Sequence, residues 1–151
     1  MSRSLLDLDP AVQGRFGEFI RACAARGVAV NVYCTRRTPE EQAALYAQGR
    51  TAPGKIATNA KPWRSWHNWG RAIDCVPYGE GPGEDDSKLD WTPFVSPLGN
   101  ALDPEDWKIM VEEADRLKIE WAGRWPSFRE YVHFQITDGL MLDGLIGGTH
   151  A

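Results

Sequence analysis

An aspartate lies in the middle of a short apolar segment, and this segment limits what the chain can fold into. Residues 72–76 read Ala-Ile-Asp-Cys-Val, which is typical of a buried strand apart from Asp74. An unpaired carboxylate in such a strand carries a desolvation penalty of several kcal/mol. We therefore expect a cationic partner for Asp74, which either an arginine or a metal ion could provide.

The segments around this strand predict an α+β domain. Three helices are expected where a capping residue precedes proline, at Asp9-Pro10, Thr38-Pro39 and Asp103-Pro104. Strands are expected at residues 28–34, 71–76, 119–121 and 131–136. Because the helices and strands do not alternate regularly, we predict a small, mainly antiparallel sheet flanked by about three helices.

Length and charge argue against several classes of protein. A chain of 151 residues with 42% hydrophobic residues fits a single domain, residues 1–151. Its net charge of −4 argues against nucleic-acid binding, because the general attraction to phosphates is missing. The start, MSRSLLDLDP, lacks a signal-peptide core, and no stretch approaches the ~20 apolar residues of a membrane span. We expect synthesis in the cytoplasm without a signal peptide, and no stable membrane insertion.

The cysteines predict neither a disulfide framework nor a thiolate zinc site. Cys23, Cys34 and Cys75 are odd in number, widely spaced and without a CxxC pair. We interpret them as reduced and mostly buried thiols.

A polar segment, residues 79–90, cannot contribute to a core and is expected to form a mobile loop next to the strand that carries Asp74. Its acidic residues Glu84, Asp85 and Asp86 could gather a second divalent cation. A solvated acidic loop is the simpler interpretation of the same residues.

Two histidines are the candidates to neutralise Asp74. His67 precedes the apolar strand, and His133 lies in a second apolar segment with Glu130 three residues before it. Two imidazoles and one carboxylate form the ligand set of a catalytic zinc site, in which water takes the fourth position. Glu130 would then be available as a general base. A single histidine is usually structural, so a metal and an arginine remain alternatives on these residues alone.

Several motifs occur in one order along the chain and carry a specific resemblance. They are Arg37-x-x-x-x-Gln42-x-x-Leu45-Tyr46-x-x-Gly49-Arg50-Thr51-x-x-Gly54, Ser65-x-His67-x-x-Gly70-x-Ala72-x-Asp74, Glu120-Trp121-x-Gly123-x-Trp125-x-x-Phe128 and His133-Phe134-Gln135. Together they resemble the zinc peptidases that cut peptidoglycan peptides. This family comprises D-Ala-D-Ala carboxypeptidases and dipeptidases, and the L-alanyl-D-glutamate endopeptidases of bacteriophage lysis.

The resemblance implies a role for each candidate residue. His67, Asp74 and His133 match the family's metal ligands, which implies one Zn²⁺ per chain in a cleft on the sheet. Glu130 matches the catalytic acidic residue, although the phage enzymes usually carry aspartate there. Arg37 matches an arginine that stabilises the oxyanion in related dipeptidases, and the adjacent Arg36 is its competitor for this role.

The function implied by the resemblance is cleavage of the L-Ala–D-Glu bond of the peptidoglycan stem peptide by a phage or prophage lysis enzyme. One alternative is a D,D-carboxypeptidase that releases terminal D-Ala. Another is a non-catalytic zinc-binding module like the hedgehog domain, which would not need Glu130 together with Arg37. We expect a monomer without a cell-wall-binding domain that reaches the wall after release, assisted by a separate pore-forming holin.

Overall fold

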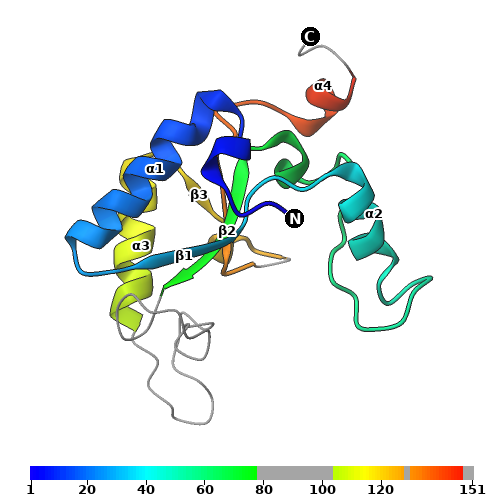
Figure 1. Cartoon of the computed structure of the whole chain (residues 1–151), viewed down its shortest axis with the longest axis horizontal. Coiled ribbons are helices and arrows are strands. Elements are labelled where there is room, and N and C mark those ends of the chain that lie inside the picture. Colours follow the sequence, from blue (N-terminus) through cyan, green and yellow to red (C-terminus); the bar gives the residue numbers. More distant parts are fainter. Residues whose placement is uncertain (78–103, 128–129, 148–151) are drawn as a thin grey trace.

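The computed structural model describes residues 1–77, 104–127 and 130–147, and these residues form an α+β arrangement (Figure 1). The helices among them are α1 (Pro10–Ala25), α2 (Pro39–Ala47), α3 (Pro104–Arg116) and α4 (Leu142–Ile146). The strands are β1 (Val30–Cys34), β2 (Ala72–Pro77), β3 (Glu120–Trp121) and β4 (His133–Gln135). Short 3-10 helices are η1 (Leu5–Asp7), η2 (Trp66–Trp69) and η4 (Ala122–Arg124). The expected loop at residues 79–90, with Glu84, Asp85 and Asp86, lies outside the described residues.

The strands form a sheet in the order β1-β2-β4-β3, and each neighbouring pair is antiparallel, so the predicted sheet type is confirmed. In the register of β2 and β4, Asp74 lies directly opposite His133. The register of β1 against β2 shifts between Val32 and Cys34, and Cys34 pairs with Asp74. The sheet therefore brings together three residues that lie far apart in the sequence.

The helix starts follow from their caps. The Asp9 carboxylate accepts a hydrogen bond from the Ala11 amide at 3.0 Å, which satisfies a free donor in the first turn of α1. At α2, the Thr38 hydroxyl accepts from the Glu41 amide at 3.1 Å, and the Glu41 carboxylate accepts from the Thr38 amide at 3.1 Å. This reciprocal capping box confirms the predicted start of the second helix.

The core lies between the helices α1 and α3 and one face of the sheet (Figure 1). Phe19 of α1 is fully buried, and its ring lies 5.3 Å from the ring of Phe134 in β4. Ile73 and Cys75 of β2 are buried in the same cluster. Because side chains alternate along a strand, this packing leaves Asp74 for the opposite face of the sheet.

Some boundaries differ from the sequence expectation. β1 begins at Val30 because Val28 still belongs to the turn after α1, where its amide donates to the Cys23 carbonyl at 2.9 Å. β4 begins only at His133, whose amide donates to the Glu130 carbonyl at 3.2 Å and so closes a turn. The short helix α4 was not expected, since five residues cannot show a helical repeat. No helix in the described part of the chain is both long and apolar enough to cross a membrane.

Candidate metal centre and active site

His67 is fixed on the 3-10 helix η2 by local hydrogen bonds. Ser65 caps this helix, and its hydroxyl accepts from the His67 amide at 3.3 Å. Gly70 ends it with φ of 67°, a left-handed conformation that favours glycine. The His67 carbonyl accepts from the amide of Arg37 at 3.1 Å, so this turn also anchors the segment that follows β1. Ser65 therefore positions His67 through the backbone.

The two ring nitrogens of His67 have different partners. Nδ1 lies 2.7 Å from the carbonyl oxygen of Thr35 and must donate its proton there. Nε2 lies 3.0 Å from the Asp74 carboxylate. The hydrogen bond to Thr35 leaves Nε2 as the nitrogen that can offer a lone pair to a metal ion.

His133 approaches the same carboxylate from the neighbouring strand. Its Nδ1 lies 3.3 Å from Oδ1 of Asp74, the oxygen that also faces His67. Its Nε2 lies 2.8 Å from Oε1 of Gln135, which accepts a hydrogen bond. Both imidazoles thus have one nitrogen bonded to an acceptor and the other directed at Asp74.

The distances from the two imidazoles to Asp74 are compatible with ligands of one tetrahedral metal ion. Zinc bonds of ~2.0–2.1 Å hold neighbouring ligand atoms about 3.3 Å apart in a tetrahedron. The two nitrogen-to-oxygen distances at Asp74, 3.0 and 3.3 Å, are close to that value. His67 and His133 are buried, and the side chain of Asp74 is 14% exposed, so an ion here would be shielded but reachable.

The carboxylate of Asp74 is stabilised by positive charge on its neighbours. Burial lowers the pKa of His67, but the charge of Asp74 and the hydrogen bond to it outweigh burial and raise the pKa to about 10. Burial likewise raises the pKa of Asp74, and the charges and hydrogen bonds of His67 and His133 outweigh it and hold the pKa far below its usual range. Without a metal, a proton on His67 therefore neutralises Asp74, and a divalent ion would replace that proton.

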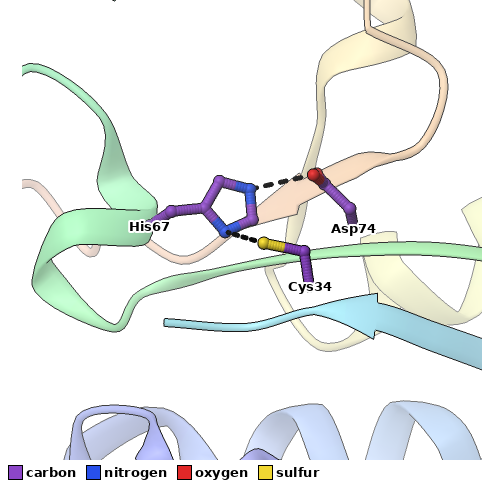
Figure 2. A group of neighbouring side chains, drawn as sticks. All are labelled: Cys34, His67 and Asp74. Atoms are coloured by element: carbon purple, nitrogen blue, oxygen red, sulfur yellow. Dashed lines mark hydrogen bonds and ion pairs between the residues drawn. The ribbon is translucent and has the colours of Figure 1, made fainter. Parts of the chain in front are cut away.

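Cys34 adjoins the same histidine, and no sequence motif indicated this. Potential ligand atoms of Cys34, His67 and Asp74 lie within 4.8 Å of one another. Figure 2 shows, however, that the sulfur and the carboxylate face different nitrogens of the ring. The sulfur lies 3.7 Å from Nδ1, whereas Asp74 faces Nε2. The sulfur therefore lies on the side of the His67 ring that is bonded to the Thr35 carbonyl, whereas His133 contacts the Asp74 oxygen that faces Nε2. All three cysteines are free and buried, which confirms the interpretation of the thiols.

Arg37 is directed into the site, and its neighbour Arg36 is exposed on the surface. The Nη2 atom of Arg37 lies 3.7 Å from Oδ2 of Asp74. Nη1 donates to the Gln42 side chain at 2.9 Å, and Gln42 is fully buried. The arginine expected as an alternative partner of Asp74 is thus present, but at a longer distance than either histidine.

Glu130 lies at the open side of the site. Its Oε2 atom lies 3.7 Å from Nδ1 of His133, and its side chain is 49% exposed. Among the described residues, no other ionic contact of Glu130 is seen. The carboxylate can therefore turn toward solvent or toward a molecule in the cleft.

These residues line one cleft with a volume of about 760 Å³. The wall opposite the sheet comes from the polar connection after α2, which contributes residues 57–61 and the basic side chain of Arg64. Arg50 holds this connection in place by donating to the carbonyls of Tyr46 and Thr58 at 2.7 and 2.9 Å. No sequence motif indicated that Lys61 and Arg64 would line this cleft.

Comparison with known proteins places the chain in a family. A family model described as D-alanyl-D-alanine carboxypeptidase matches residues 58–136. The peptidoglycan L-alanyl-D-glutamate endopeptidase CwlK of Bacillus subtilis (strain 168) is 35% identical over 130 residues, which cover 86% of this chain and 74% of CwlK. The L-alanyl-D-glutamate peptidase of Listeria phage A118 is 31% identical over 111 residues, which cover 74% of this chain and 31% of the phage protein.

Solved structures share the fold. The L-Ala D-Glu endopeptidase ChiX of Serratia marcescens superposes with a TM-score of 0.56 at 19% identity, covering 90% of this chain and 87% of ChiX. The vancomycin resistance D,D-pentapeptidase VanY, crystallised in complex with Zn(II), gives a TM-score of 0.54 at 18% identity, covering 95% of this chain and 79% of VanY. At such identities the likeness concerns the fold alone.

The antiparallel sheet presents Asp74 and His133 to an open cleft, and the adjoining 3-10 helix η2 adds His67. Two imidazoles and a carboxylate form the ligand set of a metal-dependent hydrolase. By sequence, the chain belongs to the D-alanyl-D-alanine carboxypeptidase family of peptidases. The resemblance inferred from the motifs is therefore confirmed.

Proposed function

We propose that the protein is a zinc-dependent peptidoglycan endopeptidase that hydrolyses the L-Ala–D-Glu bond of the stem peptide. The observation that carries the proposal is the convergence of His67 Nε2 and His133 Nδ1 on one carboxylate oxygen of Asp74 inside the cleft. Two relatives with more than 30% identity have names that specify this bond.

In this proposal His67, Asp74 and His133 hold one Zn²⁺ per chain. When bound, the ion supplies Lewis acidity, which polarises the scissile carbonyl and lowers the pKa of water at the site. Elemental analysis of protein purified without chelators should find about one zinc per chain. Protein that holds no stoichiometric metal would refute the ligand set.

Glu130 acts as the general acid and base. It takes the proton from the attacking water and returns it to the nitrogen of the leaving amine. Its exposure and its long, 3.7 Å contact with His133 support this role, because a loosely held carboxylate can reorient and accept a proton. The one additional methylene relative to aspartate extends its reach into the cleft.

Arg37 stabilises the negative charge that develops on the scissile carbonyl oxygen. Its side chain is 10% exposed and its guanidinium donates to the buried Gln42, so it is oriented before substrate arrives. A fixed cation in a water-poor cleft contributes most where the charge develops. The presence of both Glu130 and Arg37 in the cleft favours an enzyme over a hedgehog-like binding module.

Digestion of purified peptidoglycan followed by mass spectrometry tests the bond that is cleaved. New D-Glu N-termini are expected, and Glu130→Gln protein, as the matched control, should release none at the same dose. Release of free D-Ala instead would identify a D,D-carboxypeptidase, the activity in the family's description.

We further propose that the enzyme acts as a monomer in phage or prophage lysis and reaches the wall with the help of a separate holin. The likeness to a phage peptidase supports this setting. Expression in the cytoplasm should be harmless alone and should cause lysis once a pore-forming protein is co-expressed. Lysis that never depends on such a partner would argue against the proposed route.

A further inference from the structure

A chain of hydrogen bonds leads from His133 away from the metal site to the edge of the sheet. Nε2 of His133 lies 2.8 Å from Oε1 of Gln135, and Nε2 of Gln135 donates to Oε2 of Glu120 at 2.8 Å. The other oxygen of Glu120 accepts from the indole of Trp125 at 3.1 Å. These contacts are independent of Glu130 and Arg37.

The sheet register explains why these side chains meet. Glu120 of β3 lies directly opposite Gln135 of β4. His133 lies two residues before Gln135 and therefore on the same face of β4. Gln135 is only 4% exposed, so its amide is held between its two neighbours.

The direction of each hydrogen bond in this chain follows from the carboxylate. An ionised Glu120 can only accept, so Gln135 must turn its NH₂ group toward Glu120 and its carbonyl toward His133. The carbonyl can only accept, so His133 must carry a proton on Nε2. A neutral imidazole protonated on Nε2 has its lone pair on Nδ1, the nitrogen that faces Asp74.

We infer that Glu120 is a positioning residue that, through Gln135, holds His133 in the tautomer able to bind the metal ion. This inference rests on the metal site of the proposed function. Trp125 supports it twice, since its indole donates to Glu120 and its ring lies 5.7 Å from the ring of His133. Glu120 is exposed, so its charge remains solvated. It acts on the buried imidazole of His133 only through the hydrogen bonds of Gln135.

The decisive variant is Glu120→Gln, which keeps the size of the side chain but can also donate. A donor at this position lets the Gln135 amide reverse, which would place the proton of His133 on Nδ1 and block metal binding. We expect zinc affinity, measured by competition with a chromophoric chelator, to fall about 10–100-fold. The matched control is Glu112→Gln, which alters an exposed carboxylate of α3 that pairs with Arg26 at the end of α1. This variant should keep full zinc affinity.

Exchange of the two side chains gives a rescue that a purely structural role would not predict. In the double variant E120Q/Q135E, the carboxylate at position 135 accepts directly from Nε2 of His133 and the amide at position 120 donates to it. Zinc affinity should recover relative to E120Q. A double variant that binds zinc no better than E120Q would overturn the inference.

Nuclear magnetic resonance of the metal-free protein gives a readout independent of zinc and substrate. Asp74 favours a proton on Nδ1 of metal-free His133, and Gln135 favours one on Nε2. Long-range ¹H–¹⁵N spectra should therefore show more of the Nε2-protonated neutral tautomer of His133 in the wild type than in E120Q. Gln135→Leu removes the amide without changing Glu120 and should lower zinc affinity similarly, which covers the case of a poorly folded E120Q. Unchanged affinity and spectra in these variants would refute the inference, whereas tight zinc binding without stem-peptide cleavage would refute only the proposed function.

Discussion

Replacement of Glu130 by glutamine separates catalysis from metal binding. The substitution keeps the size and hydrogen-bonding reach of the side chain but removes the ability to accept a proton. Glu130 is 49% exposed and its contact with Nδ1 of His133 is 3.7 Å long. A substitution at such an exposed position usually changes the free energy of unfolding by no more than about 0.5 kcal/mol.

The expected effect on turnover is much larger than the effect on stability. Loss of a general acid and base lowers the rate by ~10²–10⁴-fold. At ~1.4 kcal/mol per factor of ten, this corresponds to about 3–5 kcal/mol of activation free energy. Zinc content should stay near one per chain, because His67, Asp74 and His133 are unchanged. The assay is the initial rate of D-Glu N-terminus formation on purified peptidoglycan, with zinc measured on the same samples.

Two further variants sharpen this test. Glu130→Asp should retain appreciable activity, because related phage enzymes usually carry aspartate at this place. Glu120→Gln changes the acid that is hydrogen-bonded to Gln135, and it should affect zinc affinity first. If Glu130→Gln protein still cleaves stem peptides at near wild-type rate, Glu130 has no part in proton transfer.

Other perturbations test the metal site and the core that supports it. His67→Ala removes a protein ligand, so zinc content and activity should fall together, as measured by elemental analysis and peptidoglycan digestion. In chelator-treated protein, the pKa of His67 is raised from 6.5 to about 10. The pairing of protonated His67 with Asp74 therefore contributes fully to the free energy of unfolding below pH 6.5. This contribution is lost as the pH rises toward 10. Zinc affinity should change with pH in the opposite sense, since protons compete for the ligands; urea unfolding and chelator competition across pH 6–10 check both trends. Phe19→Ala should lower the free energy of unfolding by about 3–5 kcal/mol in urea titration, because it empties a fully buried site against Phe134.

Local rules predicted the elements that hold the site. A cap followed by proline predicted the starts of α1 and α2, because the signal lies within four neighbouring residues. The apolar strand around Asp74 was predicted because a buried strand has a recognisable composition. The carboxylate of Asp74 within this apolar segment identified the position as a candidate site residue. The boundaries of β1 and β4 were predicted less well, since turns held by tertiary hydrogen bonds shorten both strands.

The lining of the cleft was harder to predict from sequence. Cys34 reaches His67 only because β1 shifts its register against β2 after Val32, and a shift of this kind leaves no mark in the amino-acid pattern. Lys61 and Arg64 lie in a connection without apolar periodicity, and Arg64 pairs with Asp143, which is distant in the sequence. Residues whose positions depend on strand register or on long-range side-chain contacts are therefore the ones that sequence reasoning misses.

The two histidines show the same limit at the level of single protons. Both were predicted as ligands from residue type and from the family resemblance, but the nitrogen that each could offer depends on a partner elsewhere in the chain. For His67 that partner is a backbone carbonyl, that of Thr35, which no side-chain substitution removes. For His133 it is the side chain of Gln135, whose direction depends in turn on Glu120. The geometry of His67 is therefore secured by the fold itself, whereas that of His133 is open to mutation, and variation of zinc affinity should concentrate at positions 120 and 135.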